Sequence, residues 1–290
     1  MDLDALASRA HTPTPGRPSP ALASFVTRIV RPLARVAFRP SILGLEHLPP
    51  TGPFLLVANH SGALAVAEVL SFASLWLELA PDRPLAGFAH PFAFAIPGLR
   101  AFMEGLGAVP STYAAGEATL ASGTPLLVFP GGDHEAGRPL WRAFEVDFGG
   151  RVGFLRLARR AGVPVVPLGI RGSHPTAPVL WQSRALAWAF VLPRLFGVKR
   201  YPLTLLAVLG ALAIALGLPV LGPARFVVAA LWLASPFALL PWVPHTIRFR
   251  IGPAFAPSEL FPEGAGDEAL AAALARVEGA VQGLVDPCPP

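Results

Sequence analysis

Along most of the chain, short unbroken runs of apolar residues alternate with longer segments whose apolar residues recur at helical spacing. A short apolar run bounded by Gly, Pro or polar residues is typical of a strand buried on both faces. The predicted strands are residues 54–58, 85–89, 126–129, 163–169 and 246–251. The predicted helices are residues 61–79, 114–122, 149–161 and 268–285. This alternation predicts an α/β fold with a mainly parallel sheet flanked by helices.

The C-terminal half contains the most hydrophobic part of the chain. Residues 203–222 and 226–243 form two uncharged runs, each about long enough to cross the hydrocarbon core of a bilayer. They predict a hydrophobic helical hairpin inserted before the last strand, with a pair of buried soluble helices as the alternative. Basic residues flank the open end of the hairpin, which predicts that both outer ends face the cytoplasm. These residues are Lys199, Arg200, Arg248 and Arg250.

The N-terminal segment changes character near residue 20. Residues 1–20 are polar and rich in proline, which predicts a disordered tail and excludes a secretory signal. Residues 21–40 are predicted to form an amphipathic helix in the headgroup region, interrupted at Pro32. The arginines of this segment that form one stripe are Arg28, Arg31, Arg35 and Arg39. An ordinary surface helix explains the same pattern equally well.

These patterns divide the chain into five predicted parts. They are a disordered tail at 1–20, an interfacial helix at 21–40, an α/β domain at 41–182, a membrane-associated hairpin at 183–245, and a last strand with an amphipathic helix at 246–290.

Composition favours contact with a membrane. The 290 residues are 53% hydrophobic and only 14% charged, whereas about a quarter of the residues in soluble domains are charged. The net charge of +5 comes almost wholly from arginine and suits an anionic lipid surface. The scattered arginines argue against a nucleic-acid partner. Dispersed histidines and the single Cys288 predict no metal site and no internal disulfide.

Residues 57–62, Val-Ala-Asn-His-Ser-Gly, place His60 where a predicted strand gives way to a helix. Loops at the carboxyl ends of strands are where open α/β sheets bind their ligands. A histidine there can act as a general base near neutral pH. A histidine that merely caps the following helix is the alternative.

Residues 126–135, Leu-Leu-Val-Phe-Pro-Gly-Gly-Asp-His-Glu, form a second strand end of this kind. Paired glycines let the backbone approach a ligand closely, and exposed N–H groups with an arginine suit a phosphate or a developing oxyanion. Taken alone, however, two glycines after a strand indicate no more than a turn.

Together with residues 163–169, Val-Pro-Val-Val-Pro-Leu-Gly, the two motifs resemble the glycerolipid acyltransferase superfamily. Its members carry an Asn-His motif, then Pro-Gly-Gly or Pro-Glu-Gly, then a Val-Pro-x-x-Pro strand. The resemblance covers roughly residues 35–180 and is strongest, in motif form, to the monoacylglycerol and diacylglycerol acyltransferase branch. It implies a membrane-associated O-acyltransferase that moves a fatty acyl group from acyl-CoA or acyl-carrier protein to a glycerolipid hydroxyl. No metal or redox cofactor is implied.

The resemblance also implies roles for individual residues. His60 would deprotonate the acceptor hydroxyl, which then attacks the acyl thioester. The implied substrate-binding residues are Asn59, Gly131, Gly132, Glu135, Arg138 and Arg171. The asparagine and the glycines would stabilise the oxyanion, whereas the Glu135 and Arg138 side chains would organise the loop and bind the polar end of a substrate. Arg171 would contact a phosphate, although a plain loop explains it equally well.

One position departs from the superfamily pattern. The histidine is usually followed by four residues and an aspartate, but here that position is Ala65, and the nearest acid is Glu68. In an unbroken helix, eight residues give about 800° of rotation, so Glu68 would lie about 80° from facing His60. Three hypotheses follow: Glu68 is the catalytic acid partner, the site works without one, or the protein is a catalytically silent lipid-binding protein on the same fold.

Overall fold

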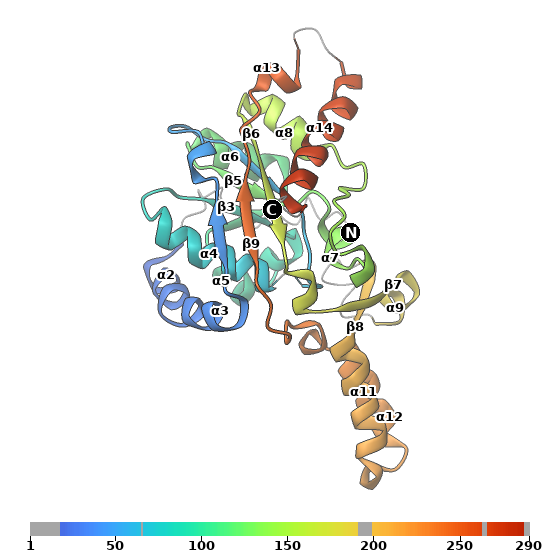
Figure 1. The fold of residues 1–290 in the computed structure, drawn as a ribbon. Helices are drawn as coiled ribbons and strands as arrows, with labels where there is room; N and C mark the ends of the chain where they lie inside the picture. Colours follow the sequence, from blue (N-terminus) through green and yellow to red (C-terminus); the bar gives the residue numbers. More distant parts are fainter. Residues whose placement is uncertain (1–17, 65, 191–198, 263–265, 287–290) are drawn as a thin grey trace.

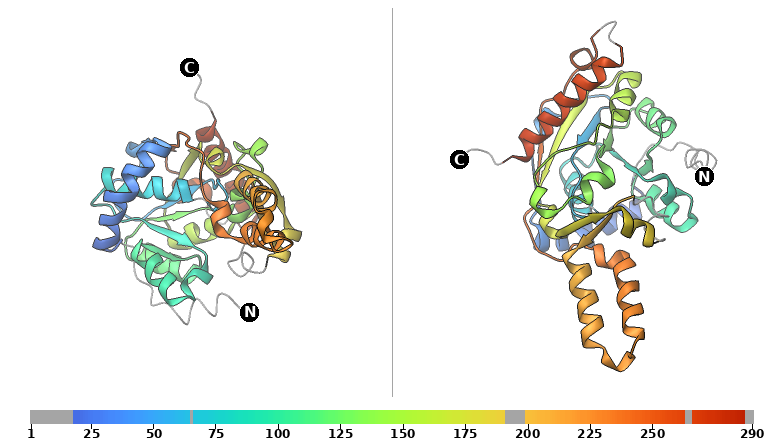
Figure 2. Two further views of the ribbon diagram at one scale, coloured as in Figure 1. Left: turned by 90° about the horizontal axis from the view of Figure 1, so that it is seen from below. Right: turned by 90° about the vertical axis from the view of Figure 1, so that its right-hand side faces the viewer.

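The computed structural model describes residues 18–64, 66–190, 199–262 and 266–286 (Figure 1). The predicted tail at 1–20 lies outside these residues except for 18–20. The described part forms a three-layered body from which a pair of helices projects (Figures 1 and 2).

The body is built on a seven-stranded sheet of order β1-β9-β6-β2-β5-β3-β4. The strands are β1 Ser41–Leu43, β2 Leu55–Ala58, β3 Ala86–Ala89, β4 Ala108–Pro110, β5 Leu126–Val128, β6 Val165–Arg171 and β9 Arg248–Ile251. From β6 to β4 all neighbours are parallel, whereas β9 runs antiparallel to β6. The mainly parallel sheet is therefore confirmed. Strands β7 Val179–Ser183 and β8 Tyr201–Thr204 form a separate antiparallel pair.

Helices cover both faces of the sheet, which explains why its central strands are unbroken apolar runs. The helices are α2 Pro20–Phe25, α3 Arg31–Phe38, α4 Val66–Leu79, α5 Pro97–Gly105, α6 Tyr113–Ala121, α7 Gly132–Ala136, α8 Gly153–Ala161, α9 Arg184–Ala189, α11 Leu205–Gly217, α12 Ala224–Ala234, α13 Pro257–Leu260 and α14 Glu268–Val285. On one face, α4 packs Phe72 and Trp76 against Phe249 of β9. On the other, α6, α8 and α14 enclose a second core around Leu55 and Val165.

Short helical turns complete the description. They are the π-helical turn η1 Val26–Val30 and the 3-10 turns η2 Leu45–His47, η3 Pro91–Phe94, η4 Leu140–Arg142, η5 His174–Thr176, η6 Pro219–Leu221 and η7 Pro236–Leu239. Turn η1 joins α2 to α3, so helical structure continues through Pro32, which lies in the first turn of α3 directly after the π-helical turn.

The hydrophobic hairpin exists, but its predicted length is wrong. Helix α11 has 13 residues and α12 has 11, and within the described ranges no helix is both long enough and apolar enough to cross a membrane. The physical reason is local: Thr204 caps the start of α11, Pro219 follows its end, and Pro236 follows α12. The alternative of buried soluble helices is also wrong, because Leu216 is 78% exposed.

Candidate active site

The motif residues meet at one edge of the sheet. His60 follows β2, the Pro-Gly-Gly loop follows β5, and Ser173 follows β6. Because β5, β2 and β6 are adjacent and parallel, their carboxyl ends lie side by side. Three segments that are distant in sequence therefore converge at the carboxyl ends of the strands, where open α/β sheets bind their ligands.

His60 is paired with Glu68. The Nδ1 atom of His60 donates to Glu68 Oε1 at 2.6 Å, and the glutamate side chain is 0% exposed. Glu68 also accepts from the Ser61 N–H at 3.2 Å, from Ser61 Oγ at 2.8 Å and from Ser173 Oγ at 2.7 Å. The carboxylate is thus held in one orientation from two sides, and it fixes the imidazole in turn.

The rotation argument against Glu68 fails because the helix starts late. Helix α4 begins at Val66, and the segment before it turns sharply, with positive φ at Gly62 (77°) and Ala63 (59°). A side chain on residue 62 would meet the Ser173 carbonyl oxygen at 3.0 Å, so glycine is required there. This turn brings Glu68, in the first turn of α4, beneath the imidazole ring.

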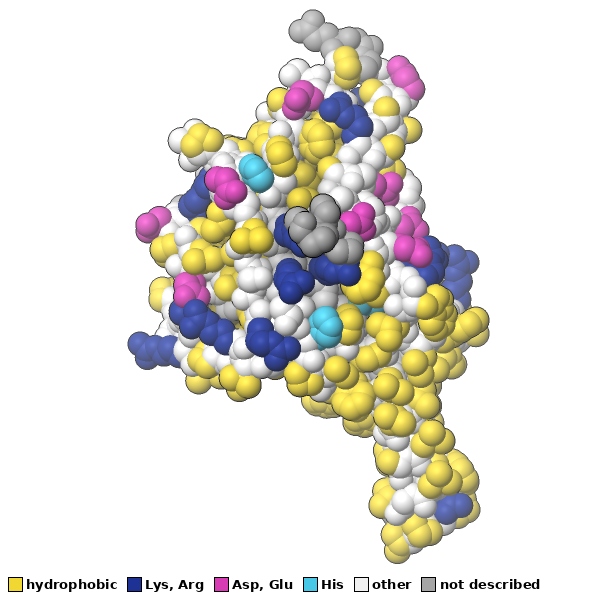
Figure 3. All heavy atoms as spheres, viewed as in Figure 1, with side chains coloured by type: hydrophobic (Ala, Val, Ile, Leu, Met, Phe, Trp, Pro, Cys, Tyr) yellow, Lys and Arg dark blue, Asp and Glu magenta, His cyan; other side chains and the backbone are white. Residues whose placement is uncertain are grey.

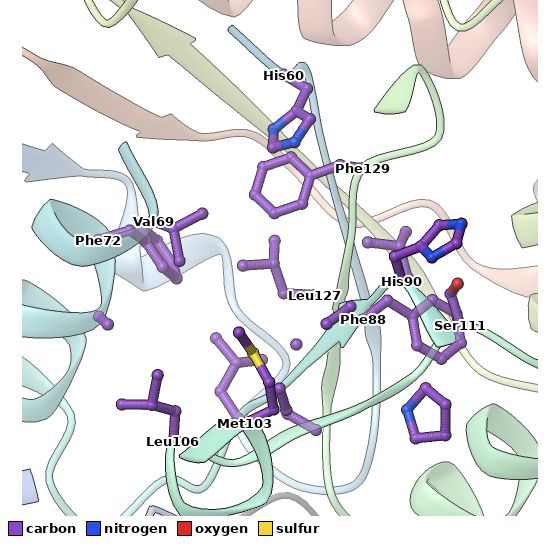
Figure 4. A pocket seen from close by; sticks show the side chains of 18 of the residues that line it. His60, Val69, Phe72, Phe88, His90, Met103, Leu106, Ser111, Leu127 and Phe129 are labelled. Atoms are coloured by element: carbon purple, nitrogen blue, oxygen red, sulfur yellow. The ribbon is translucent and has the colours of Figure 1, made fainter. Parts of the chain in front are cut away.

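The imidazole of His60 faces a large cavity. Its side chain is 18% exposed, and its ring stacks at 4.3 Å between centroids on Phe129, which also points into the cavity (Figure 4). With Nδ1–H bonded to the carboxylate, the lone pair of Nε2 is the one available to a substrate. This is the arrangement of a general base oriented by an acid.

The cavity has a volume of about 2120 Å³ and is lined mainly by apolar side chains. It extends from His60 along α4, past Val69, Phe72 and Trp76, to Met103 and Leu106 (Figure 4). Drug-sized ligand sites typically measure roughly 300–1,000 Å³. The space is therefore large enough for one or two hydrocarbon chains.

Glu135 joins the two motifs. Its buried carboxylate accepts from the His60 N–H at 3.0 Å, from the Asp147 N–H at 3.0 Å and from Arg138 at 3.0 Å. Burial raises the pKa of Glu135 to about 7, although these donors oppose the shift. The side chain has no contact with the cavity in this arrangement and holds the Pro-Gly-Gly loop against the strand end that carries His60.

The glycines of the loop are required by close contacts. A Cβ on Gly131 would lie 2.2 Å from the Glu135 side chain, and Gly132 has a φ of +47°. The Gly132 N–H donates to the Phe129 carbonyl at 3.1 Å and closes a turn. Arg151 donates to the carbonyls of Pro130 at 3.0 Å and Gly131 at 2.6 Å, which fixes the loop from outside.

Several predicted substrate-binding residues have structural partners. Asn59 exchanges two hydrogen bonds with the backbone of Ile170 in β6, at 2.9 and 2.7 Å. The Arg171 guanidinium donates to the Val285 carbonyl at the end of α14 and stacks on Phe144. Both side chains thus join elements of the fold, and Arg171 does not line the cavity.

Residues that the motif reasoning did not select also shape the site. Ser61 and Ser173 orient the acid, Arg151 fixes the loop, and Phe129 supports the imidazole. For Ser61 and Phe129 the available signal was their position in the motif segments, because Ser61 follows the Asn-His pair directly and Phe129 precedes the Pro-Gly-Gly loop.

His174 is buried near the His60–Glu68 pair, the dyad of this site. Its Nε2–H donates to the Arg138 carbonyl at 2.8 Å, and burial lowers its pKa to about 4. This histidine is therefore neutral near pH 7. Among the described residues, no cluster of His, Cys, Asp and Glu has the composition of a metal site.

Part of the chain is similar to known proteins. The Acyltransferase family model matches residues 39–171. An uncharacterized protein of Mycobacterium tuberculosis is 32% identical over 184 residues, which cover 62% of this chain and 50% of the relative. A DGAT1/2-independent enzyme synthesizing storage lipids from Bos taurus is 26% identical over 147 residues, which cover 51% of this chain and 43% of that enzyme.

The crystal structure of the 1-acyl-sn-glycerophosphate (LPA) acyltransferase, PlsC, from Thermotoga maritima covers 93% of this chain and 84% of its own, with a TM-score of 0.49 and 16% identity. The chain spans about half the length of the curated relatives it matches. Residues 39–171 are thus similar to the Acyltransferase family, and within them the parallel sheet carries a histidine–carboxylate pair beside an apolar cavity.

Proposed function

We propose that the protein transfers a fatty acyl group from acyl-CoA or acyl-carrier protein to a glycerolipid hydroxyl, with His60 as general base. The observation that carries this proposal is the His60–Glu68 pair, at 2.6 Å, opening onto an apolar cavity of about 2120 Å³. The cavity suits the hydrocarbon chain of a donor or acceptor, and the imidazole stands at its polar end.

The reaction needs no group beyond the two substrates. His60 Nε2 takes the proton of the acceptor hydroxyl as its oxygen bonds to the thioester carbonyl carbon. The resulting tetrahedral oxyanion collapses, the carbon–sulfur bond breaks, and the imidazolium returns its proton to the leaving thiolate. Glu68 stabilises the imidazolium between these steps. The Gly131 N–H is the proposed support for the oxyanion, because the Gly132 N–H already donates to the Phe129 carbonyl.

The proposal also includes a membrane surface as the site of action, with the active site toward the cytoplasm. Helices α2 and α3 and turn η1 support it, because they bury Val26 and Ala34 but leave apolar side chains open to the outside. These exposed residues are Phe25, Ile29, Leu33 and Val36. Two arginines on the same helices, Arg31 and Arg35, bind Glu78 of α4 and hold this face outward.

The test is acyl transfer from labelled acyl-CoA and acyl-carrier protein to lysophosphatidic acid, monoacylglycerol and diacylglycerol. We expect His60→Ala to reduce the rate at least about a hundredfold, because an essential base is lost. His245→Ala is the matched control, since His245 contacts backbone outside the cavity. Near-normal transfer by a folded His60→Ala variant would refute the mechanism. A wild-type protein that binds lipid but transfers nothing would establish the silent lipid binder instead.

A further inference from the structure

The hairpin of α11 and α12 is a surface that the acyl-transfer chemistry does not use. Between Thr204 and Ser235 the sequence contains a single charged side chain, Arg225. Exposure increases away from the body: Ala207 is fully buried near the base, whereas Leu216 and Val220 are 78% and 88% exposed. The space-filling view shows mostly hydrophobic side chains on the visible side of this projection, with a basic side chain near its tip (Figure 3).

The exposed apolar surface surrounds the hairpin. On α12, the successive residues Phe226, Val227 and Val228 are all exposed, and consecutive residues of a helix point about 100° apart. On α11, Leu209, Leu212 and Leu216 are exposed as well. A protein partner typically covers one face of a helix pair. The hydrocarbon chains of a membrane surround a helix pair and can contact its exposed apolar side chains on every side.

The hairpin is held firmly at its base. Trp232 Nε1 donates to the Ala207 carbonyl at 3.1 Å, and Tyr201 of β8 donates to the Leu233 carbonyl. A Cβ on Gly210 would lie 2.2 Å from Trp232, so glycine lets the two helices approach closely. The apolar tip therefore projects from the body on a helix pair that is joined to it at the base (Figure 2).

The elements around the base of the hairpin carry side chains that are typical of the headgroup region of a membrane. Exposed tryptophans lie on the elements that meet there: Trp181 on β7, Trp188 on α9 and Trp242 after η7. Tryptophan is enriched where a membrane meets water, and basic side chains attract anionic headgroups. Arg184 supplies exposed positive charge one helical turn from Trp188 on α9.

The hairpin and the catalytic dyad share one edge of the body. After α12, the N–H groups of Trp242 and Val243 both donate to the Thr176 carbonyl, at 2.9 and 3.1 Å. Thr176 donates in turn to the carbonyl of Ser173, the residue that binds Glu68. The base of the hairpin is thus linked to the strand-end loop behind His60.

We propose that the α11–α12 hairpin inserts into one leaflet of an anionic phospholipid membrane and holds the active-site edge of the body against the headgroups. From Leu209 to Gly217, helix α11 rises about 12 Å, which fits within one leaflet of the roughly 30 Å hydrocarbon core. This inference deepens the proposed membrane location and is independent of the chemistry of acyl transfer.

Vesicle flotation of the full chain tests the proposal, with vesicles of phosphatidylcholine and phosphatidylglycerol. We expect Leu216→Glu to weaken binding at least about tenfold, because a charge would enter hydrocarbon. Leu43→Glu is the matched control, since Leu43 is similarly exposed but lies on β1, at the end of the sheet order. Flotation of Leu216→Glu equal to that of wild type would overturn the proposal.

A nitroxide on Leu216→Cys, in a Cys288→Ser background, measures depth directly. We expect the label to become more accessible to oxygen and less accessible to a nickel complex when vesicles are added. Equal shielding without vesicles would show that a second copy covers the hairpin, and accessibility to nickel with vesicles would show that the tip stays in water; either result overturns the proposal. Transfer between short-chain soluble substrates should be unchanged in Leu216→Glu, which separates failure of the anchor from failure of the catalytic proposal.

Discussion

Replacing Glu68 by glutamine should reduce turnover about a thousandfold while leaving the fold intact. Glutamine keeps the size of the side chain and an oxygen that can accept from His60 Nδ1. It removes the negative charge that lies 2.6 Å from the imidazole in a fully buried position. The loss should therefore fall on the transition state, in which His60 carries the proton of the acceptor.

The magnitude follows from the burial of the pair. Opposite unit charges about 4 Å apart, at an effective dielectric constant of about 20, attract by roughly 4 kcal/mol. About 1.4 kcal/mol corresponds to a tenfold change in rate, which gives about three orders of magnitude. Because Glu68 is 0% exposed, solvent and salt should weaken this attraction little.

The assay is steady-state acyl transfer with the acceptor that wild type prefers. We expect kcat to fall and KM to change little, because the charge matters only after proton transfer begins. Glu78→Gln is the matched control: Glu78 lies on the same helix and binds arginines of the N-terminal helices instead of His60. If Glu68→Gln retains kcat within tenfold of wild type, Glu68 does not stabilise the imidazolium, and the site works without an acid.

Three further outcomes are expected. Ser173→Ala should lower kcat by about tenfold with little loss of stability, since one hydroxyl that orients Glu68 is removed. Ala73→Phe should reduce transfer of long acyl chains more than of short ones, because Ala73 lines the cavity one helical turn beyond Val69. For His174, the pKa of about 4 in the folded state lies below the ordinary histidine value of 6.5, which applies to the unfolded chain. As pH falls, the unfolded chain therefore binds the extra proton first. The free energy of unfolding should then fall by about 2 kcal/mol between pH 7 and pH 5, measured by urea denaturation, and His174→Gln should abolish that part of the loss.

The parts of the fold that the sequence predicted are those with strong local signals. Strands β2, β5 and β6 are buried apolar runs, and α14 occupies the predicted range because its buried residues recur at helical spacing. Strands β1 and β4 are only three residues long, and β8 pairs with β7 across a long segment, so no local period marks them. These strands depend on tertiary contacts.

The sequence predicted which residues belong to the site better than it predicted how they are arranged in space. His60 and Glu68 were named from the motif and from the absence of a nearer acid, but their contact depends on the turn at Gly62 and Ala63, which shortens α4 at its start. Hydropathy also overstated the length of the hairpin helices, because a window of apolar residues contains no information on where Thr204 begins α11 or where Pro219 and Pro236 follow the helix ends. Local capping decided the lengths.

The position of β9 between β1 and β6 sets an order of events during synthesis. Ser41 of β1 pairs with Arg248 of β9, on the order of 200 residues later in the chain. At a synthesis rate of roughly 5–20 residues per second, β9 is made about ten to forty seconds after β1. The hairpin lies between them in sequence, so it leaves the ribosome before the sheet can close. A fragment limited to residues 39–171 would lack both β9 and α14, whose Val277 and Val281 cover one face of the sheet, and should not fold alone. The order in which the elements emerge therefore exposes the apolar hairpin to its surroundings while the catalytic sheet is still incomplete.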